Sequence, residues 1–361
     1  MTARHRSQVI LLVVLVAIVA FLWQCTGAFD REEDAAAIDV FGPWLGEEAD
    51  AFAASTEAFT FLTGVDVNYT GSNNFDADLR ERVSGGLGLP DIAFIPQPAL
   101  FSELVSLDLL VPLADDTVDA IVENFPVERE DLAASDGEAY LAPYRSNIKS
   151  LVWYRPDVFE AGGWTAPETL DELVSLADEI SGSGLAPWCF ALEAGAATGW
   201  AASDWIEDLV LRVAGLDVYD SWVNGDTRFS DAPIEESFRL FDDLVLAPGR
   251  TLGGAQRILS TPVEEAGLPL FDDEPGCAMY KQATFATGWF PDGVEVGTDV
   301  DFFVLPGSEA DDDATGDHAP LLSGGDAAIQ FSDRPDVSRL MTYLMTPDGS
   351  EEWAARGGYL L

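Results

Sequence analysis

A loop that combines glycine, tryptophan and acidic residues contains the residue types best suited to hold a polar ligand. It follows the apolar run 187–192 and includes Glu193, Gly199, Trp200 and Asp204. Carboxylates accept hydrogen bonds from hydroxyl groups, and indole rings offer flat apolar surfaces to C–H groups. A sugar presents both kinds of group, and glycine lets the backbone approach it closely. We therefore predict that Glu193 and Trp200 contact a sugar, and that Asp204 either does so or caps the following helix.

Three short strands that alternate with helices predict a sheet able to position further residues. The expected strands span 37–41, 66–69 and 91–95, with helices at 47–62 and 75–84 between them. This order is typical of a parallel sheet covered by helices. In such sheets, ligands gather outside the carboxyl ends of the strands.

Several polar or aromatic residues lie at those strand ends. Trp44 follows the first strand, and we predict that it stacks on the ligand, with ordinary loop packing as the alternative. Glu47 or Glu48 is predicted to accept hydrogen bonds from sugar hydroxyls, although carboxylates also stabilise helix N-termini. Asn73 and Gln97 each offer a donor and an acceptor, so each either binds the ligand or completes a turn.

A second α/β unit is predicted from Asn147 onward. It begins with a strand at 150–154, and its later elements are helices at 170–181, 202–214 and 234–246, strands at 278–281, 302–305 and 327–331, and helices at 335–345 and 347–355. Trp205 and Ile206 are predicted to face its core. The acidic stretch 308–317 is interpreted as a solvated loop, with a calcium loop as the alternative.

Length and charge restrict the class of protein. Single cores stop growing at about 250–300 residues, so 361 residues fit two lobes better than one. The chain has 64 acidic and 18 basic residues, a net charge of −46, and only two lysines, Lys149 and Lys281. Nucleic-acid binding is excluded, because phosphate neutralisation needs clustered Lys and Arg. We interpret the carboxylates as a strongly hydrated acidic surface, which a saline habitat would fit.

The N-terminus has the pattern of an export signal. Basic residues Arg4 and Arg6 precede an apolar run at 9–23, which is too short for a typical membrane span. We predict a signal peptide at 1–25 and a linker at 26–35. Cys25 is predicted to carry a lipid, and the alternatives are ordinary cleavage near Ala28 or an uncleaved anchor.

The remaining cysteines and histidines indicate a disulfide rather than a metal site. In an exported protein, the two other cysteines, Cys189 and Cys277, most simply form one disulfide. The only histidines are His5, in the signal, and His318, in a polar loop. A Cys/His zinc site cannot be assembled from these residues, and we expect no metal and no cofactor.

Five segments in order resemble the extracellular solute-binding proteins (family 1) of carbohydrate ABC transporters, in the branch that handles α-glucosides. They are PDIAFIPQP (90–98), APYRSNIKSLVWY (142–154), PWCFALEAGAATGWAASDWIEDLVLR (187–212), CAMYKQATF (277–285) and LLSGGDAAI (321–329). The resemblance covers the chain from residue 36 onward. Family members usually continue beyond the segment at Gly357–Tyr359 into further helices, whereas this sequence ends at Leu361.

The resemblance implies a two-lobed periplasmic-binding-protein-like α/β fold, with hinge crossover strands and a ligand cleft between the lobes. Lobe 1 would comprise 36–146 and 320–361, and lobe 2 would comprise 147–319. The crossovers would be the strand around 147–154 and a segment near 319–325. The protein would act outside the cytoplasmic membrane or in the periplasm, as a monomer that delivers a sugar to permease subunits.

The resemblance also implies ligand contacts near the hinge. Asn147 is expected to face the ligand, and Trp289 is expected to stack on it. Lys149 either reaches the cleft or pairs with a carboxylate. Gly324, Gly325 and Asp326 either present amides and a carboxylate to the sugar or form a tight hinge turn.

Enzymatic signatures are weak in this sequence. A glycosidase needs two carboxylates about 5 to 9 Å apart, a criterion that such an acidic chain meets by chance. The sequence contains neither a GxSxG nucleophile motif nor a GxxxxGK[ST] phosphate loop. We therefore predict binding without turnover. The alternative is a secreted carbohydrate-active enzyme or a sugar sensor.

Overall fold

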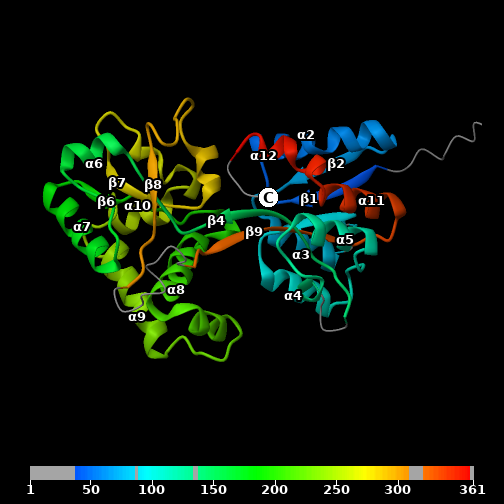
Figure 1. The fold of residues 1–361 in the computed structure, drawn as a ribbon, viewed down its shortest axis with the longest axis horizontal. Helices are drawn as coiled ribbons and strands as arrows, with labels where there is room; N and C mark the ends of the chain where they lie inside the picture. The colour runs from blue at the N-terminus through cyan, green and yellow to red at the C-terminus, as the bar shows by residue number, and fades with distance from the viewer. Residues whose placement is uncertain (1–36, 86–87, 133–136, 309–319, 358–361) are drawn as a thin grey trace, which may run out of the picture.

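A computed structural model describes residues 37–85, 88–132, 137–308 and 320–357. The predicted signal peptide, linker, Cys25, acidic loop and His318 lie outside these ranges. The chain forms two α/β lobes, each built around its own sheet (Figure 1). The predicted two-lobed architecture is therefore confirmed.

The sheet of lobe 1 has the strand order β2-β1-β3-β9-β4. β1 runs parallel to β2 and β3, whereas β9 runs antiparallel to β3 and β4. The strands are β1 (Ile38–Gly42), β2 (Val67–Gly71), β3 (Ile92–Ile95), β4 (Ala142–Ile148) and β9 (Ser323–Gln330). The predicted strand–helix–strand order thus gives the parallel part of this sheet.

Helices cover both faces of this sheet because its central strands are apolar on both sides. Ile92 and Phe94 of β3 pack on one face, while Ala93 and Ile95 pack on the other. The first face is covered by α2 (Gly46–Thr63), α5 (Asp115–Asn124), α11 (Pro335–Leu344) and α12 (Glu351–Ala354), and the second by α3 (Phe75–Gly85) and α4 (Pro98–Ser106). Short turns η1 (Arg129–Leu132) and η7 (Pro347–Gly349) complete the lobe.

The sheet of lobe 2 has the order β6-β7-β5-β8 and packs largely against long helices. Its strands are β5 (Leu151–Tyr154), β6 (Ala186–Trp188), β7 (Cys277–Lys281) and β8 (Asp301–Val304). Its helices are α6 (Pro156–Gly162), α7 (Leu170–Ser183), α8 (Trp200–Val223), α9 (Ala232–Phe241) and α10 (Gly254–Ser260), with shorter turns η2 (Gly195–Ala197), η3 (Asp242–Leu246), η4 (Val263–Glu265), η5 (Leu268–Leu270) and η6 (Thr284–Trp289). Trp205 and Ile206 are buried in the lobe 2 core, as predicted.

Two antiparallel strands, β4 and β9, carry the chain between the lobes (Figure 1). The single crossover strand predicted at 147–154 is wrong. β4 ends at Ile148 in the sheet of lobe 1, and β5 begins at Leu151 in the sheet of lobe 2. The break at Lys149 and Ser150 lets one continuous segment of chain contribute strands to two different sheets.

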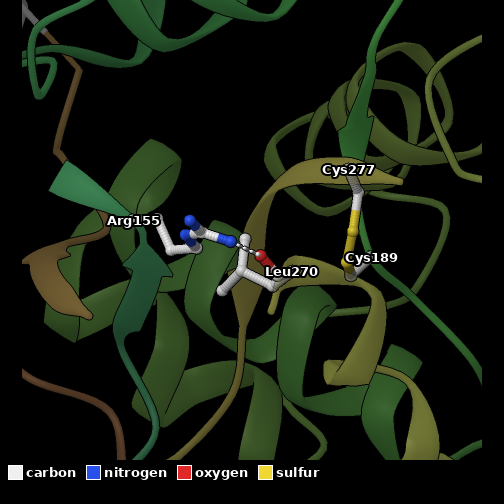
Figure 2. The surroundings of a disulfide bond; sticks show 4 residues. All are labelled: Arg155, Cys189, Leu270 and Cys277. Carbon is white, nitrogen blue, oxygen red and sulfur yellow. Dashed lines mark hydrogen bonds between the residues drawn. A yellow bond between two sulfur atoms is a disulfide. The ribbon is translucent and has the colours of Figure 1, made fainter. Parts of the chain in front are cut away.

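Cys189 and Cys277 form a disulfide, which confirms the predicted pairing (Figure 2). Their Cα atoms are 5.4 Å apart, a separation typical of disulfides. The bond joins the residue after β6 to the first residue of β7. Nearby, Arg155 donates a hydrogen bond to the carbonyl of Leu270, 3.4 Å away, so the end of β5 is tied to the same region (Figure 2).

In the described ranges, no helix has the length and apolar character needed to cross a membrane. The same ranges contain no group of three or more His, Cys, Asp or Glu side chains arranged to hold a metal ion.

Candidate functional site

Three aromatic side chains of lobe 2 form a surface that we call the aromatic platform: Trp200, Phe285 and Trp289. The ring centroids of Trp200 and Phe285 are 5.9 Å apart, and those of Phe285 and Trp289 are 4.9 Å apart. All three are only partly buried. Trp200 begins α8 and Trp289 ends η6, and both indoles also pack against buried core residues. The platform is therefore held by the core, while its three residues stay partly exposed.

The two tryptophans are among the ligand contacts predicted from the sequence, whereas Phe285 is not. The signal was available, because Phe285 lies four residues before Trp289 in a short segment that follows a buried strand. The two tryptophans come from segments nearly ninety residues apart (200 and 289). Only the folded lobe shows that Phe285 connects them.

Glu193 supplies a carboxylate in the loop that leads to Trp200. Its Oε1 accepts a hydrogen bond from the backbone N–H of Gly195 at 3.0 Å. Its own carbonyl accepts one from Val263 at 2.9 Å, so the loop is attached to η4. The side chain remains partly exposed. Glu193 is thus a fixed acceptor on the approach to the platform.

Both loops that flank the platform touch lobe 1. The backbone N–H of Ala196 donates to Oδ1 of Asn74 at 3.3 Å, and Oγ1 of Thr284 donates to Oδ1 of Asn147 at 3.4 Å. Gly195 has a φ of +57°, and an added Cβ there would lie 3.0 Å from Asn74 Oδ1, so this close approach favours glycine. The platform therefore lies at the boundary between the lobes.

The predicted ligand contact of Trp44 is corrected by the structure. The indole is 1% exposed and packs against Phe94 and Trp353, with ring centroids 4.4 and 4.5 Å away. Its Nε1 donates to Oδ2 of Asp326 at 3.1 Å. The loop-packing alternative describes this residue, because partners far away in the sequence bury its ring and satisfy its N–H group.

The Asp326 carboxylate also contacts other residues inside the protein. It is 5% exposed and forms an ion pair with Arg145, which pairs in turn with Oε1 of Glu48 at 2.5 Å. Burial alone would lower the pKa of Arg145, but the attraction of Asp326 and Glu48 raises it above its usual value. The guanidinium lies over the adjoining rings of Trp44 and Trp353, 5.1 and 5.0 Å from their centroids. The predicted sugar contact of Asp326 is therefore corrected to a charge contact inside lobe 1.

The segment around Gly325 is part of strand β9 and not a tight hinge turn, so that alternative is wrong. Gly325 pairs with Ser146 of β4, and an added Cβ would lie 1.9 Å from the carbonyl oxygen of Arg145. Only glycine fits such an approach of two backbones. The predicted role of the Gly325 amide toward a ligand stays a prediction.

Asp204 and Lys149 form an ion pair at the hinge. Lys149 Nζ lies 2.7 Å from Oδ1 of Asp204, whose side chain is 10% exposed. The predicted helix-cap alternative for Asp204 is wrong, because α8 already begins at Trp200 with Gly199 as its N-cap. Its Oδ2 is buried and has no hydrogen-bond partner in the described structure. Asp204 thus lies beside the platform, but its carboxylate is mostly buried.

The remaining predicted residues are placed as follows. Asn147 is 4% exposed and bonded to Thr284, so its predicted ligand contact is corrected to a contact between the lobes. Glu47, Asn73 and Gln97 are exposed. The described contacts join none of these three to the aromatic platform. Asn73 is next to Asn74, the residue that accepts the Ala196 hydrogen bond of lobe 2, and Asn74 Nδ2 donates to Oδ1 of Asn73 at 3.3 Å.

Two α/β lobes joined by antiparallel crossovers, with an aromatic platform at their boundary, define the class of two-lobed ligand receptors. The profile of the bacterial extracellular solute-binding proteins matches residues 45–350. The chain belongs to this family.

Individual relatives agree with this assignment. The chain is 34% identical over 349 residues to the α-glucosides-binding periplasmic protein AglE of Rhizobium meliloti, covering 94% of this chain and 75% of that protein. It is also 34% identical to the osmoprotective compounds-binding protein GgtB of Synechocystis, covering 96% of this chain and 81% of that protein. Among solved structures, the bacterial solute receptor AcbH shares the fold, with a TM-score of 0.70 and 19% identity over 90% of this chain and 81% of that chain.

Proposed function

We propose that this protein captures an α-glucoside or a related oligosaccharide between its lobes and delivers it to the membrane permease of an ABC importer. The observation that carries the proposal is the aromatic platform at the lobe boundary, together with the carboxylate of Glu193 in the loop that leads to Trp200. Aromatic faces next to fixed hydrogen-bond acceptors suit the C–H faces and hydroxyl groups of a sugar. The α-glucosides named for the relative AglE support this choice of ligand class.

In the proposed mechanism, Trp200 and Trp289 stack on the sugar rings, and Glu193 accepts hydrogen bonds from hydroxyl groups. Lobe 1 then contributes Asn73 and Gln97 when the lobes approach each other. A ligand shifts this equilibrium only by binding the closed form more tightly than the open form. The sugar should therefore contact both lobes at once. The protein is a receptor without turnover in this proposal, acting outside the cytoplasmic membrane.

The charge pattern of the site supports a neutral ligand. Lys149 and Arg145, which lie near the crossovers, are each paired with carboxylates. An anionic ligand would have to compete with Asp204 or Asp326 for them. Glucosides without a charged group avoid this competition.

Calorimetric titration of the mature protein with maltose, trehalose, sucrose and a β-glucoside tests the proposal. We expect micromolar affinity, about −8 kcal/mol, for at least one α-linked disaccharide. The β-glucoside should bind at least about tenfold more weakly, a difference of roughly 1.4 kcal/mol. Heat from none of these sugars, with a folded circular-dichroism spectrum, would remove the α-glucoside assignment.

Asn74 should contribute to the affinity through the contact between the lobes. Replacing it with alanine removes the acceptor for the Ala196 amide, and we expect about threefold to tenfold weaker sugar binding, the effect of one neutral hydrogen bond. Asn124→Ala is the matched control, because that amide bonds only locally to Ala120 within α5. Equal affinities of the two variants would show that the contact does not assist closure.

A further inference from the structure

The break between β4 and β5 contains a buried serine that touches both crossovers. Ser150 is fully buried, and its Oγ donates to Oδ1 of Asp208 at 3.0 Å. The same oxygen accepts a hydrogen bond from the backbone N–H of Leu322 at 2.8 Å. Ser150 lies in the first crossover, Leu322 directly precedes β9 in the second, and Asp208 lies on α8. One hydroxyl group thus joins three separate segments.

Backbone hydrogen bonds also join the segments that meet at Ser150. Lys149 N–H donates to the carbonyl of Leu322 at 2.8 Å, and Leu305 N–H donates to the carbonyl of Ser150 at 2.8 Å. The two crossovers are therefore aligned with each other at this point. The Ser150 side chain extends that alignment to α8, where the Lys149–Asp204 ion pair makes a second contact.

Lys281 connects the contact between the two crossovers to β7, the strand that leads to Phe285. It is the last residue of β7, and its Nζ lies 3.2 Å from Oδ2 of Asp208. The same ammonium donates to the carbonyls of Lys149 at 3.1 Å and Asp204 at 3.4 Å. It also lies 5.2 Å from the ring centroid of Trp205. Lys281 therefore binds α8, β7 and the first crossover together.

Separating the buried charges of Asp208 and Lys281 would cost much free energy. The side chains of Asp208 and Lys281 are 0% and 2% exposed, and Arg212 is a second buried cation, with Nε 3.3 Å from Asp208 Oδ1. A buried ion that loses its partner is strongly destabilised. We expect the group formed by Ser150, Asp208 and Lys281, the hinge cluster, to move as one unit.

The hinge cluster lies next to both segments that carry the aromatic platform. Asp208 follows Trp200 by eight residues on α8, and Lys281 precedes Phe285 by four residues. We propose that the hinge cluster consists of positioning residues that set the platform relative to the two crossovers, with Ser150 as the link that transmits lobe movement. This inference rests on the proposed function, since it assigns residues that act through the same sugar site.

Ser150→Ala tests the proposal, with Ser237→Ala as the matched control. Ser237 is equally buried in lobe 2, but its Oγ bonds only to the carbonyl of Pro233 within α9. We expect Ser150→Ala to weaken sugar binding about tenfold, the size of a lost hydrogen bond to a charged acceptor. Ser237→Ala should bind as wild type does. Calorimetry with the tightest of the four sugars measures both.

Site-resolved hydrogen exchange of the Leu322 amide without sugar provides a second readout. Its N–H should exchange about tenfold faster in Ser150→Ala than in wild type, because its acceptor is gone, and should be unchanged in Ser237→Ala. Wild-type affinity in Ser150→Ala, or unchanged exchange at Leu322, would overturn the proposal. If wild type itself bound no sugar, the proposed function would fail, while the exchange result would still decide whether Ser150 links the crossovers.

Discussion

Replacing both Trp200 and Trp289 with alanine should weaken sugar binding by about a hundredfold while leaving the protein folded. Each indole is partly exposed, and each is proposed to stack on the sugar at the lobe boundary. A loss of tenfold for each ring corresponds to about 1.4 kcal/mol, a normal value for an aromatic contact. Calorimetric titration of the double variant with the preferred disaccharide measures the effect.

Trp164 and Trp222 provide the control for this experiment. Both are partly buried tryptophans of lobe 2, but they pack against Phe159 and Phe229 instead of joining the platform. Their double alanine variant should lose stability and keep its affinity. If the platform variant kept wild-type affinity, its tryptophans would be packing residues and the assigned site would be wrong.

Asp326→Ala should lower the free energy of unfolding by about 3–5 kcal/mol, the usual cost of leaving a buried charge without its partner. The Arg145 side chain is 8% exposed, and Glu48, its other carboxylate partner, has a side chain that is 40% exposed. The indole N–H of Trp44 would lose its acceptor as well. Urea unfolding followed by circular dichroism measures the change.

Asp336→Ala is the matched control in the same lobe. Asp336 pairs with Arg334, whose side chain is 32% exposed and also lies 3.2 Å from Asp91. Removing this carboxylate should cost only about 1 kcal/mol, because water and Asp91 still solvate the cation. Equal losses in the two variants would contradict the structural role assigned to the Arg145–Asp326 pair.

The sequence predicted where the backbone goes better than where the side chains point. Trp44 and Trp200 both follow apolar strands or runs, and both were predicted to stack on a ligand. Trp200 stays partly exposed, whereas Trp44 is covered by Trp353 and hydrogen-bonded to Asp326. Those partners lie about three hundred residues later, so no local pattern could have revealed them.

The contacts at the hinge, like those of Trp44, depend on residues far away in the sequence. The sequence located the crossover around Asn147–Tyr154, but the break into two strands depends on pairing with β9 in one lobe and with β7 and β8 in the other. Ser150 and Asp208 carry no local signal of their connection, since a serine between strands and an acid in a helix are both common. By contrast, the disulfide followed from the export signal and from the two cysteines that remain after Cys25.

The crystal structure of the mature protein with its tightest-binding sugar tests the central claim most directly. We expect the sugar between the two lobes, with ring faces against Trp200 and Trp289 at about 4 Å, ordinary contact distance, and a hydroxyl bonded to Glu193. Side chains of lobe 1 should complete the site. A sugar bound on the outer surface of one lobe, with the aromatic platform bare, would contradict the account.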